Sequence, residues 1–124
     1  MLPNKLLDTY SRDLKTIELS KLLQTENEVS LGGLCGNLKV IIPLSISYLN
    51  ENNHCFICAD KKEAMLYYSN LCNYLNNEKV FYFPYSNRKP YDDELINNAN
   101  VIMRTETIQH LKQNENEKTY VVTY

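Results

Sequence analysis

The sequence predicts an α/β fold in three layers, with a parallel sheet of about four strands and helices on both faces. Short apolar runs alternate along the chain with longer amphipathic segments, which is typical of βαβ units. Several of these runs are apolar at successive positions, as strands buried on both faces of a parallel sheet are. A glycine-containing turn also joins the first run to a helical segment.

Four short apolar segments are the predicted strands, at residues 29–31, 54–59, 80–83 and 120–123. Apolar residues at three- and four-residue spacing predict the helices, at residues 4–26 with a break near 11–13, 38–49, 61–75 and 95–112. Asp60 followed by Glu63 predicts a capping box at the start of the third helix. Pro43 removes a helical hydrogen bond, so we expect the helix at 38–49 to begin late, near residues 39–42, or to kink.

The expected domain organisation is a helical segment at residues 1–27 followed by an α/β domain at residues 28–124. Strands in this architecture usually feed another helix, so we expect the domain to be incomplete at its carboxyl end. The last strand is then expected to form an unpaired edge, with Val121 and Val122 partly exposed.

Composition narrows the class of protein. A formal charge of −2 and a pI near 5.7 argue against a major phosphate-binding surface, because nucleic-acid-binding modules are usually basic. The sequence has neither a basic stretch before an apolar core at its start nor the ~20 apolar residues of a membrane span. We expect a cytoplasmic protein without membrane contact, whose four cysteines are reduced thiols.

The glycine turn has the outline of a P-loop, whose pattern is G-x-x-x-x-G-K-[ST]. Gly33, Gly36 and Lys39 are present, but Leu38 stands at the second glycine position and Val40 at the hydroxyl position. Leucine brings a side chain into the phosphate cradle, and valine has no oxygen for magnesium. The prediction is a degenerate nucleotide site with no catalytic residue, cofactor or metal. An active P-loop ATPase that uses Lys39 is the alternative.

Other residue groups offer weaker chemistry. The first group consists of four residues whose side chains can bind zinc: His54, Cys55, Cys58 and Cys72. Residues three apart on a strand point to opposite faces, so ordinary buried thiols are the preferred interpretation. Asp60, at a strand's carboxyl end, has the position of a phospho-acceptor or magnesium ligand, but its capping role already explains it. The acidic run at residues 92–94 is interpreted as a complement to a helix dipole rather than a cation site.

Residues 84–90 form an aromatic-proline loop, and we expect its Tyr85 and Arg88, with the adjacent Tyr91, to form a packing surface for a neighbouring domain. Tyr and Arg are favoured at protein interfaces. A solvated loop, with both tyrosines covering the sheet edge locally, is the alternative.

Three stretches carry a resemblance to a known family: residues 81–91 (FYFPYSNRKPY), 97–106 (NNANVIMRTE) and 31–36 (LGGLCG). They resemble the amino-terminal region of bacterial transcription-repair coupling factors (Mfd). The resemblance extends from about residue 14 to residue 124 and is most specific in residues 81–106.

The resemblance implies an α/β domain similar to the first domain of the repair helicase UvrB, descended from a P-loop motor that has lost its nucleotide site. It also implies that an adjoining module recruits UvrA, and that downstream domains bind RNA polymerase and DNA and house the ATP- and magnesium-dependent motor. The expected role is non-catalytic: to help engage UvrA and to restrain the motor. Only five residues, 92–96, stand where UvrB carries a long DNA-clamping hairpin, so direct damage recognition is not expected. A free-standing α/β binding module remains a further alternative.

Overall fold

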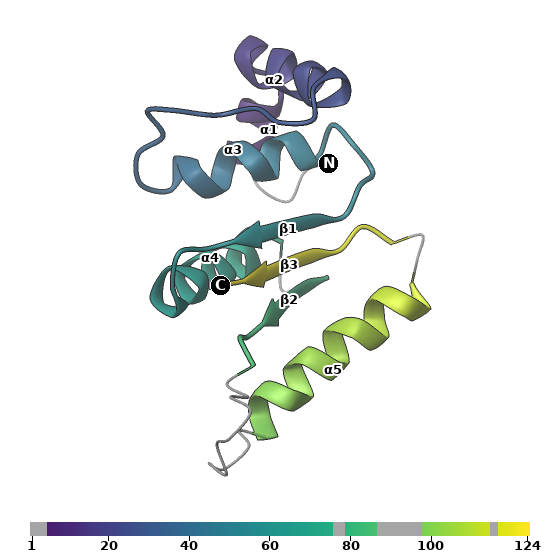
Figure 1. The fold of residues 1–124 in the computed structure, drawn as a ribbon. Coiled ribbons are helices and arrows are strands. Elements are labelled where there is room, and N and C mark those ends of the chain that lie inside the picture. The colour runs from purple at the N-terminus through teal and green to yellow at the C-terminus, as the bar shows by residue number, and fades with distance from the viewer. Residues whose placement is uncertain (1–4, 76–78, 87–97, 115–116) are drawn as a thin grey trace. The chain divides into compact units, whose positions relative to one another are not determined.

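The computed structural model describes residues 5–75, 79–86, 98–114 and 117–124, which form five helices and three strands (Figure 1). The chain divides into two compact units, Met1–Asn52 and Asn53–Tyr124. The first contains helices only, and the second contains the whole described sheet. The mixed α/β class is therefore confirmed, with a sheet smaller than expected.

The first unit is built from α1 (Lys5–Ser11), α2 (Leu14–Thr25) and α3 (Leu38–Ser47). α3 packs against both α1 and α2, so the boundary expected after residue 27 falls inside this unit. Its buried apolar side chains are Leu7, Leu19, Val40, Ile41, Leu44 and Ile46.

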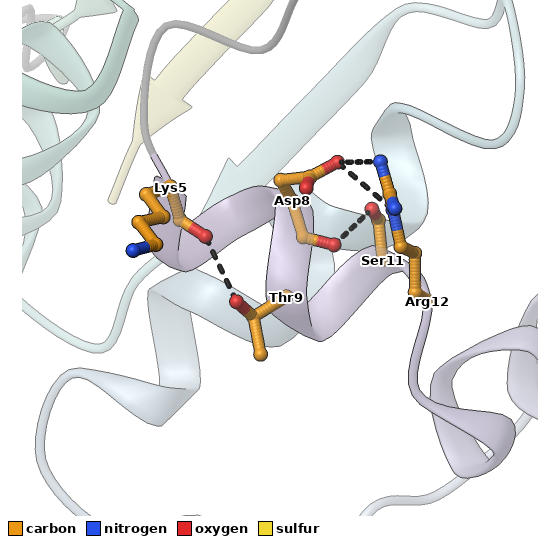
Figure 2. Close-up of polar contacts among 5 residues, drawn as sticks. All are labelled: Lys5, Asp8, Thr9, Ser11 and Arg12. Carbon is orange, nitrogen blue, oxygen red and sulfur yellow. Dashed lines mark hydrogen bonds and ion pairs between the residues drawn. The ribbon is translucent and has the colours of Figure 1, made fainter.

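Polar side chains satisfy the carbonyls of α1, as Figure 2 shows. The Thr9 hydroxyl donates to the Lys5 carbonyl at 2.9 Å, and the Ser11 hydroxyl donates to the Asp8 carbonyl at 2.9 Å. Arg12 pairs with the Asp8 carboxylate at 3.0 Å, one helical turn away. The Asp8 carbonyl lies in the last turn of α1, where carbonyls lack a helical donor, so the Ser11 hydroxyl supplies one.

The break predicted near residues 11–13 is confirmed, because a new helix starts there with its own cap. The Asp13 carboxylate accepts hydrogen bonds from the backbone N–H groups of Lys15 at 3.1 Å and Thr16 at 3.3 Å. Asp13 has an extended backbone, as an N-cap residue normally does. α1 and α2 are therefore two helices rather than one.

Pro43 lies in the interior of α3, which begins at Leu38. A proline there leaves the carbonyl four residues earlier without its helical donor. The helix nevertheless begins at Leu38, before the range 39–42 that was expected for a late start. It includes the proline instead and keeps apolar side chains buried on either side of it, at Ile41 and Leu44.

The second unit contains a parallel sheet of β1 (His54–Ile57), β2 (Val80–Phe83) and β3 (Tyr120–Thr123), in the order β1-β3-β2. In the register, Phe56 is paired with Val122 and Tyr82 is paired with Val122 from the other side. The expectation that the last strand forms an unpaired edge is wrong, because β3 is hydrogen-bonded on both sides and Val122 is 0% exposed. Val121 is half-buried.

The predicted strand at residues 29–31 is also wrong: the structure has no strand there. Leu31 is exposed, and Val29 is only half-buried. Three residues with one exposed apolar side chain gain too little burial to hold a strand without a neighbour to pair with.

α4 (Lys61–Leu75) and α5 (Asn98–Gln113) cover opposite faces of the sheet. Successive residues of a strand point to opposite faces. Tyr82 contacts Tyr68 of α4, with ring centroids 5.8 Å apart, whereas its neighbour Phe81 contacts His110 of α5 at 4.5 Å. The predicted bounds of α4, β2 and β3 are confirmed. No helix in the described residues is long and apolar enough to cross a membrane.

Candidate functional site

The glycine turn leads directly into α3, as the sequence predicts. Gly33 and Gly36 have φ angles of 77° and 56°, a left-handed conformation that glycine adopts without steric cost. The Leu38 N–H donates to the Cys35 carbonyl at 3.2 Å, and the Lys39 N–H donates to the Gly36 carbonyl at 3.4 Å, which closes the first helical turn. Gly36 and Lys39 therefore lie in one turn at a helix start, and Gly33 lies in the irregular chain just before it.

Two features separate this turn from a working phosphate cradle. In residues 5–32, which the structure describes, no strand precedes it, although the P-loop places its turn between a strand and a helix. Val40, at the hydroxyl position, is 2% exposed and belongs to the buried core. A side chain in that place has neither the oxygen nor the exposure to coordinate a cation beside a phosphate. Lys39 is exposed and is the one group of this turn with charge to offer a phosphate.

The carboxyl end of β2 is the second candidate region. The Arg104 Nη1 atom donates a hydrogen bond to the Pro84 carbonyl at 2.8 Å, and its guanidinium carbon lies 4.1 Å from the centre of the Phe83 ring. Pro84 is fully buried, whereas Tyr85 is 59% exposed. Of the predicted interface residues, Tyr85 thus has an exposed ring, and Arg88 and Tyr91 lie outside the described residues.

Arg104 was not among the predicted site residues, because the side chains that α5 turns toward the sheet are not its apolar ones. The helix exposes apolar side chains (Val101, Ile102 and Ile108) and turns polar ones toward the sheet, among them Arg104 and His110. An apolar stripe normally marks the buried face of a helix. The available signal was the spacing of Arg104 and His110 around the buried Thr107, which places all three on one side of the helix.

Asp60 and Glu63 form a variant of the predicted capping box at the start of α4, in which Glu63 binds the N–H of Ala59 rather than that of the cap residue Asp60. The Asp60 carboxylate accepts a hydrogen bond from the Glu63 N–H at 2.8 Å, and the Glu63 carboxylate accepts one from the Ala59 N–H at 2.8 Å. Both carboxylates are therefore engaged with the backbone at the start of α4. This geometry supports the capping role over a phospho-acceptor or magnesium ligand.

The cysteines differ in exposure. Cys58 is buried and Cys72 is half-buried, but Cys55 is exposed, so the expectation of a buried thiol is wrong for Cys55; Cys35, in the glycine turn, is exposed as well. Burial, together with the neighbouring Glu63 and Asp60 carboxylates, raises the pKa of Cys58, which lowers the thiolate fraction needed for nucleophilic or redox chemistry. In the described part of the chain, no three or more His, Cys, Asp or Glu side chains gather where they could hold a metal ion.

Tyrosines crowd the α4 face of the sheet. Tyr82 contacts both Tyr68 and Tyr124, with ring centroids 5.8 and 6.3 Å apart. Burial, together with the neighbouring Tyr124, raises the pKa of Tyr82 to about 12. Tyr82 therefore remains neutral at ordinary pH, and its ring packs between the other two rather than serving as an acid or base.

The described residues thus combine a glycine turn without magnesium chemistry and an arginine-held loop that exposes a tyrosine. Among their described residues, neither arrangement places a nucleophile beside a base, the geometry that covalent catalysis requires. The second has the composition of a binding surface. Comparison with protein-family models, with curated proteins and with solved structures finds no match to this chain.

Proposed function

We propose that this chain is the amino-terminal part of a transcription-repair coupling factor, and that it serves as a non-catalytic, UvrB-like domain. In this role it helps an adjoining module to recruit UvrA and restrains the motor until RNA polymerase is bound. The observation that carries the proposal is the resemblance of residues 81–106 to the amino-terminal region of that family.

The second unit supports the proposal. The described parts of the resembling block form β2 and α5, which pack on each other through Phe81 and His110 and through Arg104 and Pro84. The described residues that carry the resemblance therefore lie in two elements that contact each other. The finer fold, a three-layer P-loop-NTPase-like domain with a degenerate nucleotide site, belongs to the same proposal.

The glycine turn supports the non-catalytic part. The buried Val40 gives magnesium no ligand, so we assign no nucleotide to this segment and place ATP and magnesium in the motor of the parent protein. UvrA, RNA polymerase and DNA are the proposed partners, all engaged through parts of the parent protein beyond this chain. The exposed Lys39 is what favours the second candidate, an active P-loop ATPase.

The proposal is tested in the source cell by following repair of ultraviolet lesions on each strand of an active gene. Deleting the gene that encodes this chain should remove the faster repair of the transcribed strand and leave the other strand unchanged. Restoring the gene should restore the difference between the strands. Equal repair of both strands before and after deletion would show that the coupling role is wrong.

A matched variant separates the two candidates. The restored gene carrying Lys39→Ala should support strand-selective repair as well as the unchanged gene does, because no nucleotide contact is assigned to Lys39. A Lys39→Ala gene that fails to restore selectivity, while the protein accumulates normally, would favour the ATPase.

A further inference from the structure

The sheet has two edge strands, β1 and β2, because β3 lies between them (Figure 1). The backbone N–H and C=O groups of successive strand residues point alternately to the two sides of the strand. The His54 N–H donates to the Thr119 carbonyl at 2.9 Å, so the even-numbered residues of β1 face β3. The backbone groups of Cys55 and Ile57 therefore point away from β3, and no described residue forms a backbone hydrogen bond with them.

The outer edge of β2 is protected against a further strand. The Tyr120 N–H donates to the Lys79 carbonyl at 2.8 Å, so the outward positions at the end of β2 are Tyr82 and Pro84. Pro84 has no N–H, and its carbonyl already accepts a hydrogen bond from Arg104 at 2.8 Å. A proline and a charged side chain at an edge are devices that prevent unwanted strand pairing.

The edge of β1 has no such protection. Its sequence, His-Cys-Phe-Ile, contains neither proline nor an Asp, Glu, Lys or Arg side chain. Ile57 is 80% exposed and Cys55 is exposed as well, on the face of β1 opposite to Phe56, whose ring lies 6.1 Å from that of Tyr67 in α4. An edge with free backbone groups, an exposed apolar side chain and no charge is a template for another strand.

Two copies of this edge are complementary to each other. When two β1 strands run antiparallel about a two-fold axis at Phe56, Cys55 of one copy lies opposite Ile57 of the other, and each such pair exchanges both of its hydrogen bonds. Every outward N–H and C=O group of Cys55 and Ile57 is then paired. The two Phe56 residues form the intervening pair without hydrogen bonds, in which the side chains of neighbouring strands come closest.

We propose that β1 is a self-association edge, at which two copies of this chain join their β1 strands antiparallel and extend the sheet across a two-fold axis. A symmetric dimer uses the same surface on both copies, so that surface must match itself. β1 meets this condition because its free groups lie on either side of Phe56 and it has no charged side chain to repel its twin. The inference goes beyond the proposed function and does not depend on it.

Sedimentation equilibrium of the full chain under reducing conditions, from micromolar to millimolar concentration, should show a monomer–dimer equilibrium. Ile57→Pro removes an outward N–H and leaves the hydrogen bonds between β1 and β3 in place, so it should lower the association constant about ten-fold. Ile57→Val keeps the N–H and most of the side chain, and should change it less than about two-fold. A monomer at every concentration, or a dimer that folded Ile57→Pro leaves unchanged, would overturn the inference.

Disulfide capture tests the register without a proline. In a Cys35→Ser background, Ile57→Cys places a thiol opposite Cys55 of the other copy, at the Cα separation of about 5.5 Å that a disulfide can span. Oxidised glutathione should then give a covalent dimer, as two thiols form the S–S bond and glutathione is reduced. Adding Cys55→Ser should abolish the covalent dimer. Its absence before that change, or an equal yield after it, would show that the proposed pairing is wrong.

Discussion

The Asn53 side chain joins the starts of two neighbouring strands: its carbonyl oxygen accepts a hydrogen bond from the Thr119 N–H at 2.9 Å, across 66 residues of sequence. The Thr119 carbonyl in turn accepts from the His54 N–H at 2.9 Å. Thr119 is fully buried, so its backbone groups depend on these two partners. Asn53 thus fixes where the pairing of β1 with β3 begins.

Asn53→Ala should lower the free energy of unfolding by about 1–3 kcal/mol, because it leaves the Thr119 N–H without its acceptor. Asn53→Asp keeps an acceptor and should cost less. Asn52→Ala, at the preceding exposed residue, is the matched control and should change little. Urea unfolding followed by circular dichroism gives the comparison. Equal effects of Asn52→Ala and Asn53→Ala would contradict this role.

The decrease of the unfolding free energy at acidic pH should depend on His54. Burial, with a smaller contribution from Lys118, lowers the pKa of His54 below its usual 6.5. The folded state therefore binds a proton less readily than the unfolded state. The stability that the neutral ring provides is present above pH 6.5 and is lost as pH falls through the lowered pKa.

His54→Phe keeps a ring to stack on Tyr120, whose centroid lies 5.7 Å from that of His54, but it cannot titrate. Between pH 7 and pH 5 the variant should lose less stability than the unchanged chain. The measurement is the unfolding free energy across that range. Parallel pH profiles for the two proteins would rule out His54 as the source of the acid dependence.

The decrease of the unfolding free energy at alkaline pH should depend on Tyr82. Burial and the neighbouring Tyr124 raise the pKa of Tyr82 from 10 to about 12. Here the folded state keeps its proton more firmly than the unfolded state does. The contribution is fully present below pH 10 and is lost as pH rises from 10 through 12. Tyr82→Phe should therefore flatten the fall in unfolding free energy between pH 9.5 and 12. An equally steep fall in the variant would place the alkaline dependence elsewhere.

Lys79 occupies a left-handed conformation, with φ of 60°, and its ammonium group lies 3.6 Å from the Glu117 carboxylate. A non-glycine residue pays about 1–2 kcal/mol for that backbone, whereas an exposed ion pair contributes about 0–1 kcal/mol. In a Glu117→Gln background, where the pair is already lost, Lys79→Gly should stabilise the chain by about 1 kcal/mol. A loss of stability in that background would mean that the left-handed turn is not strained.

Elements with strong local signals were predictable from sequence. The helix at Lys61–Leu75 has a capping box at its start, and the strands Val80–Phe83 and Tyr120–Thr123 are dense apolar runs between polar connectors. In these segments the residues that decide the structure are close neighbours in sequence, so the pattern contains the answer.

Properties set by distant partners were not predictable in the same way. The central place of β3 depends on which strands pair, and an apolar run such as Val121 and Val122 is the same at an edge or in the middle of a sheet. The contact of Arg104 with Pro84 depends on how α5 is rotated, and its exposed apolar residues give the opposite signal. The incorrect strand prediction at residues 29–31 has the same cause, because a short apolar run does not show whether a second strand lies beside it.

The last prediction concerns the glycine turn. Calorimetry of the purified chain with ATP and magnesium should show no binding, because Val40 is buried and has no oxygen for the cation. Converting the turn toward the P-loop pattern with Val40→Thr should not create binding. It should destabilise the chain by about 1–3 kcal/mol, since it moves a hydroxyl group into the apolar core. Val40→Ile adds a methylene without a polar group and serves as the control for altered volume. Micromolar ATP affinity that Lys39→Ala abolishes would show that the turn binds nucleotide and that the degenerate-site interpretation is wrong.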